Sequence, residues 1–176
     1  MKQLTTLMLL MLLATTAIAQ KNFSYFKFCI KNERNELLLV KYKGIWEPIG
    51  KRYNNSESIK KTLEIMAKEV GVEIKNPHLG ALVNQYYNEA PFGIIFHFYA
   101  AEYTSGTPVP PADCTDIRWF PMEEAIKLIP FESMAEIIHK FMVEEPGKTI
   151  GGAIRIDNTE WPHSRITDYI DPFYIL

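Results

Sequence analysis

The chain has 176 residues, of which 47% are hydrophobic and 23% charged, and its formal net charge is −2. This length suits one ordinary domain with a sizeable core, and the composition argues against intrinsic disorder. No basic stripe stands out, so we expect no nucleic-acid partner.

Residues 1–19 have the pattern of a cleavable secretory signal. Lys2 is followed by a stretch of mostly Leu, Met and Thr, and Ala17-Ile18-Ala19 offers small residues around a cleavage point. The apolar run is too short to span a bilayer comfortably. We predict cleavage after Ala19, export to the periplasm or the extracellular space, no membrane attachment afterwards, and a single domain over residues 20–176. An uncleaved anchor and a wrongly assigned start codon are the alternatives.

The first half of that domain predicts a hairpin, a loop and a helix. Residues 23–30 and 37–40 are typical of two strands joined by a polar turn, and Gly and Pro punctuate a loop over 44–50. Ser56 is the expected N-cap of the helix, and Gly71 is the expected C′ residue. The apolar face of this helix repeats at helical spacing through Ile59, Leu63, Met66, Ala67 and Val70.

The second half mixes strands and shorter helices. We expect strands at 79–83, 93–100, 117–120 and 152–156, loops at 84–91 and 103–114, and helices at 121–125 and 131–143. The apolar tail, residues 161–176, is expected to pack back on the domain. Interspersed strands and helices favour an α/β (α+β) fold with a mixed sheet between helices.

The two cysteines, Cys29 and Cys114, leave two alternatives open. Export would permit a disulfide between them. The apolar strand pattern around Cys29 favours a buried free thiol instead.

Three motifs resemble those of the Nudix hydrolase superfamily. The run from Gly50 to Val72 keeps the spacing of the Nudix box, G-x5-E-x7-R-E-U-x-E-E-x-G-U, in which U is aliphatic. Trp46-Glu47-Pro48 is similar to the W-x-x-P-G-G segment but one residue shorter, and residues 116–125 look like E-x-R-W-F-x-x-E-E-A. Their order implies a Nudix-like α/β/α sandwich with a mixed β-sheet, covering about residues 23–143.

The resemblance also implies a chemistry whose residues are mostly missing. Nudix enzymes hydrolyse a diphosphate linkage with magnesium, which three carboxylates on one helix face hold. The corresponding positions here are Ile65, Lys68 and Glu69, while Ser56 and Glu64 replace the leading acid and the arginine. Lys68 is expected to place a cation where the metal would lie. Glu69 is therefore the one remaining metal candidate, and magnesium is expected only if activity persists.

Other acids could contribute to catalysis. The candidate catalytic residues are Glu69, Glu64 and Glu57. Glu64 and Glu69 are five residues apart, so they point about 140° away from each other on a helix. A solvated helix face with salt bridges explains Glu57 and Glu64 better than a relocated metal site.

The candidate ligand-binding residues lie inside the box and on both sides of it. They are Trp46, Arg52, Tyr86, Tyr87 and Asp113. An aromatic, amide-rich loop suits a base or a sugar, although a hairpin tip over the core is the alternative for Tyr86 and Tyr87, and an Asx turn is the alternative for Asp113.

These observations lead to three hypotheses about function. The first is an exported Nudix-like domain that binds a nucleotide-like or sugar-phosphate ligand, or a partner, without efficient hydrolysis. The second is a divergent metal-dependent pyrophosphohydrolase acting on a nucleoside diphosphate linked to another group. The third is an interaction module that uses exposed tail aromatics such as Trp161 and Tyr169.

Overall fold

The computed structural model describes residues 24–54 and 56–176, so the predicted signal over residues 1–19 lies outside the described part. The strands are β1 (Ser24–Lys31), β2 (Glu36–Tyr42), β3 (Ile45–Glu47), β4 (Ile49–Tyr53), β5 (Val72–Tyr87), β6 (Ile94–Gly106), β7 (Cys114–Pro121), β8 (Ile150–Asp157) and β9 (Arg165–Ile175). The helices are α2 (Ile59–Glu69), α3 (Met122–Leu128) and α4 (Glu132–His139), and α4 continues into a π-helical turn, η1 (Lys140–Glu144).

All nine strands belong to one mixed sheet. Its main order is β3-β2-β1-β6-β5-β8-β9, while β4 pairs with β1 and β7 pairs with β2. The β1–β6 and β5–β8 pairs are parallel, and the remaining pairs are antiparallel. The expected mixed sheet is therefore confirmed.

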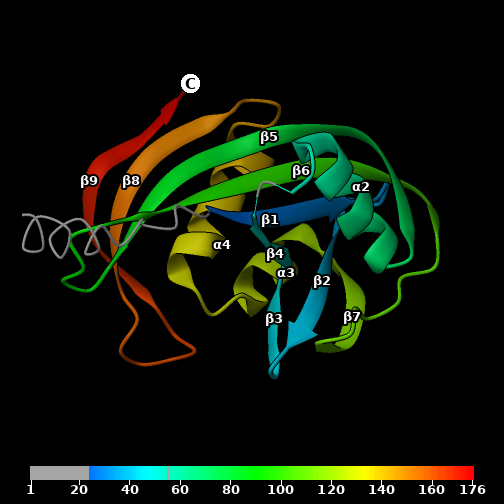
Figure 1. Cartoon of the computed structure of the whole chain (residues 1–176), viewed down its shortest axis with the longest axis horizontal. Coiled ribbons are helices and arrows are strands. Elements are labelled where there is room, and N and C mark those ends of the chain that lie inside the picture. Colours follow the sequence, from blue (N-terminus) through cyan, green and yellow to red (C-terminus); the bar gives the residue numbers. More distant parts are fainter. Residues whose placement is uncertain (1–23, 55) are drawn as a thin grey trace, which may run out of the picture.

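Helices cover both faces of the sheet, with α2 on one side and α3 and α4 on the other (Figure 1). Consecutive strand residues point to opposite faces. In β2, accordingly, Leu37 and Leu39 enter the core beneath α3 and α4, whereas Leu38 and Val40 enter the core beneath α2. Burial on both faces explains the continuous apolar run of this strand. The arrangement confirms the predicted α/β/α sandwich.

Helix α2 begins two residues later than the sequence predicts. Ser58, and not Ser56, is the N-cap, and its side chain accepts a hydrogen bond from the backbone N–H of Lys61. The hydroxyl of Ser56 instead donates to the side-chain oxygen of Asn54. The other end is as predicted: Gly71 follows the helix with φ of +73°, a conformation that suits glycine.

Three predicted loops, 44–50, 84–91 and 103–114, are too long because backbone pairing extends into residues that look like loop. The predicted 44–50 loop contains β3 and the start of β4, which pairs with β1. Strand β6 continues to Gly106 because it pairs with the start of β5, and β5 continues to Tyr87 because its end pairs with β8. The tail forms the edge strand β9 against β8.

The predicted hairpin forms with little pairing between its two strands. Strands β1 and β2 follow one another through a turn but share the single register pair Lys31–Leu37, because β1 pairs mainly with β4 and β6.

Cys29 is a buried free thiol, as expected, and Cys114 is also unpaired. Burial raises the pKa of Cys29 to about 12. Among the described residues, no helix is both long and apolar enough to cross a bilayer.

Candidate functional site

Two adjoining hollows contain the polar and aromatic groups that could bind a ligand. The first, which we call the charged cleft, has a volume of about 770 Å³ and is lined by β1, β3, β4, the end of α2 and the loop before β7. The second, the aromatic pocket, has a volume of about 450 Å³ and lies against α4 and the β8–β9 loop. Tyr25, Lys27 and Glu47 line both, so the two hollows adjoin at these side chains.

An ion pair forms the junction between the hollows. The ammonium of Lys27 donates to Glu47 Oε2 at 2.6 Å, and the two side chains are 10% and 15% exposed. The register of β1 with β4 places Lys27 opposite Gly50. A Cβ on Gly50 would lie 2.9 Å from Lys27 Nζ, so the glycine leaves the space that the ammonium occupies.

Glu69 is the one acidic box residue that lines the charged cleft. It ends α2 and forms an ion pair with Lys51 of β4 at 2.6 Å. Both side chains are partly exposed, which limits the strength of this pair. Glu69 therefore faces the cleft with an ammonium already beside it.

The other box positions point elsewhere. Glu64 and Lys68 line a separate hollow against β5 and β6, and Glu64 pairs with Lys61 at 3.7 Å. Ile65 and Glu57 line a fourth, smaller hollow beside β4. Thus Glu57, Glu64 and Glu69 are not brought together.

The lysines that contact the carboxylates of the charged cleft are not the lysine that the sequence predicted there. Lys68 was expected in the cleft, yet Lys27 and Lys51 are the lysines that contact its carboxylates. The Nudix motifs do not include the first strand, so they give no reason to single out Lys27. A signal did exist, because a lysine between Phe26 and Phe28 in an apolar strand requires a buried partner.

The oxygen donors of the charged cleft can be compared with those that a magnesium ion requires. Magnesium takes about six oxygen ligands in near-octahedral geometry. Across residues 24–54 and 56–176, no group of three or more His, Cys, Asp or Glu side chains is arranged to hold a metal. Glu47 and Glu69 each face an ammonium at 2.6 Å, and Asp113 is an exposed carboxyl on the loop before β7.

The predicted ligand-binding residues fall into two groups. Arg52 and Asp113 line the charged cleft, and Tyr87 lines the aromatic pocket. Trp46 packs edge-on against Phe120 with ring centroids 4.9 Å apart and lines neither hollow.

Tyr86 lies away from both hollows because it alternates with Tyr87 along β5. Its hydroxyl accepts a hydrogen bond from Asn84 at 3.0 Å, and the Arg155 guanidinium lies 5.6 Å from its ring centroid. The sequence grouped the two tyrosines because it placed both in a loop.

The aromatic pocket draws its rings from five parts of the chain, and the sequence singled out Tyr87 and Trp161 but not the others. The members are Tyr25, Tyr87, Phe96, Phe131 and Trp161. Burial raises the pKa of Tyr87 to about 12, and its hydroxyl donates to Gln85 Oε1 at 3.0 Å.

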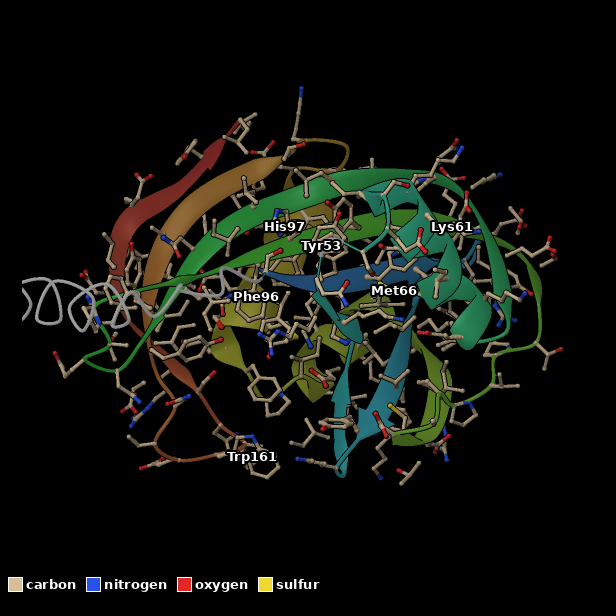
Figure 2. The ribbon with its side chains drawn as sticks, in the orientation of Figure 1. Tyr53, Lys61, Met66, Phe96, His97 and Trp161 are labelled. Carbon is tan, nitrogen blue, oxygen red and sulfur yellow. The ribbon has the colours of Figure 1, made fainter. Side chains whose placement is uncertain are left out.

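Trp161 lies on the β8–β9 loop, on the opposite side of the sheet from Lys61 of α2 (Figure 2). This loop is attached to α4 because the backbone N–H of Glu132 donates to the Ser164 carbonyl at 3.2 Å. The Trp161 side chain is nevertheless 61% exposed. A ring bound in the pocket could therefore cover it.

Solved structures identify this architecture. The mutator MutT protein from Bacillus halodurans superposes with a TM-score of 0.62 at 16% identity, covering 82% of this chain and 97% of that protein. The chain has the Nudix fold. A NUDIX hydrolase from Nitrosomonas europaea superposes at 0.61 with 20% identity, covering 78% and 80% of the two chains.

A third structure with the Nudix fold contains a ligand. The NUDIX domain of Shewanella oneidensis NrtR, solved in complex with ADP ribose, superposes at 0.52 with 16% identity and covers 69% of this chain and 83% of that one. No protein-family model matches the sequence, and no curated protein matches it. At these identities the structural likeness establishes the fold of this chain.

Proposed function

We propose that this Nudix-fold domain binds a small ligand that joins a ring to an anionic group, such as a nucleotide-like molecule or a sugar phosphate, without efficient hydrolysis. The observation that carries the proposal is that the two hollows adjoin, because Tyr25, Lys27 and Glu47 line both. An aromatic pocket with a few polar groups suits a planar or sugar ring. The adjoining cleft offers ammonium groups for the anionic part.

The absence of hydrolysis follows from the donor set of the cleft. Nudix chemistry requires carboxylates that converge on magnesium. Here Ile65 and Lys68 replace two of them, and Glu69 is paired with Lys51. A divalent cation would have to displace Lys51 from Glu69, and the Glu47 carboxylate of the same cleft is paired with Lys27.

Thermal shift with the purified protein tests the proposal. ADP ribose and ribose 5-phosphate, each supplied with excess EDTA, are the probes. Ligand at one hundred times its Kd stabilises a folded protein by about 2.7 kcal/mol, which raises the Tm measurably. We expect a rise in Tm with at least one probe and no product by chromatography; no rise with either probe would refute the proposal.

A matched pair of variants locates the binding site. Trp161→Ala removes an exposed ring that lines the aromatic pocket, and Phe92→Ala removes an exposed ring elsewhere. Loss of one stacked ring weakens binding by about 1 kcal/mol, or roughly fivefold. We expect this loss for Trp161→Ala alone, with the Tm of each unliganded variant near that of the wild type.

The competing proposal is a divergent pyrophosphohydrolase. Its support is that Glu69 and Asp113 both line the cleft beside Gly50, in a Nudix fold. It requires magnesium-dependent cleavage of a nucleoside diphosphate derivative that Glu69→Gln abolishes.

Export is a separate proposal that concerns residues 1–19. Its test is the N-terminus of the secreted protein, which should begin at Gln20 when measured by mass spectrometry. The third function, an interaction module, is supported by the exposed rings of Trp161 and Tyr169. It predicts partner binding that these rings control and that none of the small probes affects.

A further inference from the structure

The Lys27 ammonium has unused hydrogen-bonding capacity at the junction of the two hollows. An ammonium carries three N–H donors. In the described part of the chain, the recorded acceptor for this group is Glu47 Oε2. The side chain is 10% exposed, so bulk water compensates the remaining donors poorly.

The surroundings leave room for a second acceptor. Lys27 lines both hollows, and Gly50 opposite it contributes no side chain that would cover the ammonium. A partly desolvated ammonium attracts an oxyanion more strongly than one in water, because the effective dielectric constant is lower. Lysine binds phosphate as a point charge, which suits a diphosphate oxygen.

We propose that Lys27 is a resident cation that binds the phosphate or diphosphate of the ligand directly and replaces a divalent metal in this cleft. The inference rests on the proposed function, since it assumes that a ligand occupies the joined hollows. Lys51 adds positive charge on the neighbouring strand, and it too is paired with a carboxylate, Glu69, at 2.6 Å. Lys27 is the more buried of the two ammonium groups and the one that both hollows share.

Glu47 contributes one of the negative charges that oppose anion binding in the charged cleft. Lys27, Lys51 and Arg52 are balanced in the cleft by Glu47, Glu69 and Asp113. Replacing Glu47 with glutamine keeps an oxygen for Lys27 but removes one negative charge. This change should therefore strengthen anion binding, whereas a purely structural role for the pair predicts that any disruption weakens it.

Calorimetric titration with inorganic pyrophosphate and with ADP ribose, in excess EDTA, tests the inference. We expect Glu47→Gln to bind each probe more tightly than the wild type. Adding Lys27→Met to Glu47→Gln should then weaken binding by about tenfold or more, the effect of losing one charged hydrogen bond. Comparing these two variants avoids leaving Glu47 as an unpaired buried carboxylate.

The control is Lys61→Met, which removes an ammonium from the exposed face of α2 and should leave affinity unchanged. Folding of each variant is verified by circular dichroism and Tm. Equal affinities of Glu47→Gln and the double variant, or binding that requires magnesium, would overturn the role of Lys27 while leaving the proposed ligand site intact. Failure of both probes to bind any of these proteins would refute the proposed function itself.

Discussion

The Lys27–Glu47 ion pair makes a quantitative prediction about stability. Its partners lie 2.6 Å apart and their side chains are 10% and 15% exposed. With an effective dielectric constant of about 20, the attraction at this distance is about 6 kcal/mol, most of which offsets the desolvation of the two charges. Removing one charged partner should therefore destabilise the protein more than removing both.

The perturbation is a double-mutant cycle of Lys27→Met and Glu47→Gln. Each single variant leaves one charge poorly solvated and should destabilise the protein by about 3 kcal/mol. The double variant buries no unpaired charge, so its loss should stay within about 1.5 kcal/mol. Urea unfolding gives each free energy, and the expected coupling between the two sites is then at least about 4.5 kcal/mol.

The Lys61–Glu64 pair on α2 is the matched control. Its atoms lie 3.7 Å apart and its side chains are 56% and 48% exposed. The same cycle, Lys61→Met with Glu64→Gln, should give a coupling of about 0.5 kcal/mol or less. If the two cycles gave equal couplings, the ion pair at the junction of the hollows would not be a buried interaction.

Two further predictions concern the backbone and the thiols. Gly71→Ala should destabilise the protein by about 1–3 kcal/mol more than Gly44→Ala in urea unfolding. Both glycines have positive φ, but a Cβ at Gly71 would lie 2.5 Å from the Thr107 carbonyl oxygen, whereas the space around Gly44 is open. Equal losses of stability would exclude this steric cause. Iodoacetamide at pH 8 should label Cys114 well before Cys29, whose pKa of about 12 leaves roughly one thiol in ten thousand ionised. Equal labelling rates by mass spectrometry would contradict the buried environment of Cys29.

The sequence predicted those features of the fold that local chemistry determines. The apolar stripe of α2 and the glycine after it require no knowledge of distant residues. The glycine is confirmed, and so is the stripe from Leu63 to Val70, whereas Ile59, which was predicted to belong to it, is 44% exposed. Strand ends were less predictable because they depend on partners far along the chain. Gly50, for example, looked like loop but pairs with Lys27 of β1.

The prediction of the candidate site had the same limit, because contacts between residues far apart in the sequence could not be foreseen. The box spacing identified Glu69 as the acid most relevant to the family's chemistry, and Glu69 does line the cleft. Lys27 and Phe131 were missed because neither belongs to a motif and only the folded chain brings them to adjoining hollows. Tyr86 was included since neighbours in a loop can share a surface, whereas neighbours in a strand cannot.

The most direct test of the account is a magnesium titration combined with a turnover assay on ADP ribose. We expect ADP ribose to bind equally well in excess EDTA and in magnesium, and we expect no product to accumulate at any magnesium concentration. Saturable magnesium binding accompanied by repeated turnover, with both lost in Glu69→Gln, would contradict it.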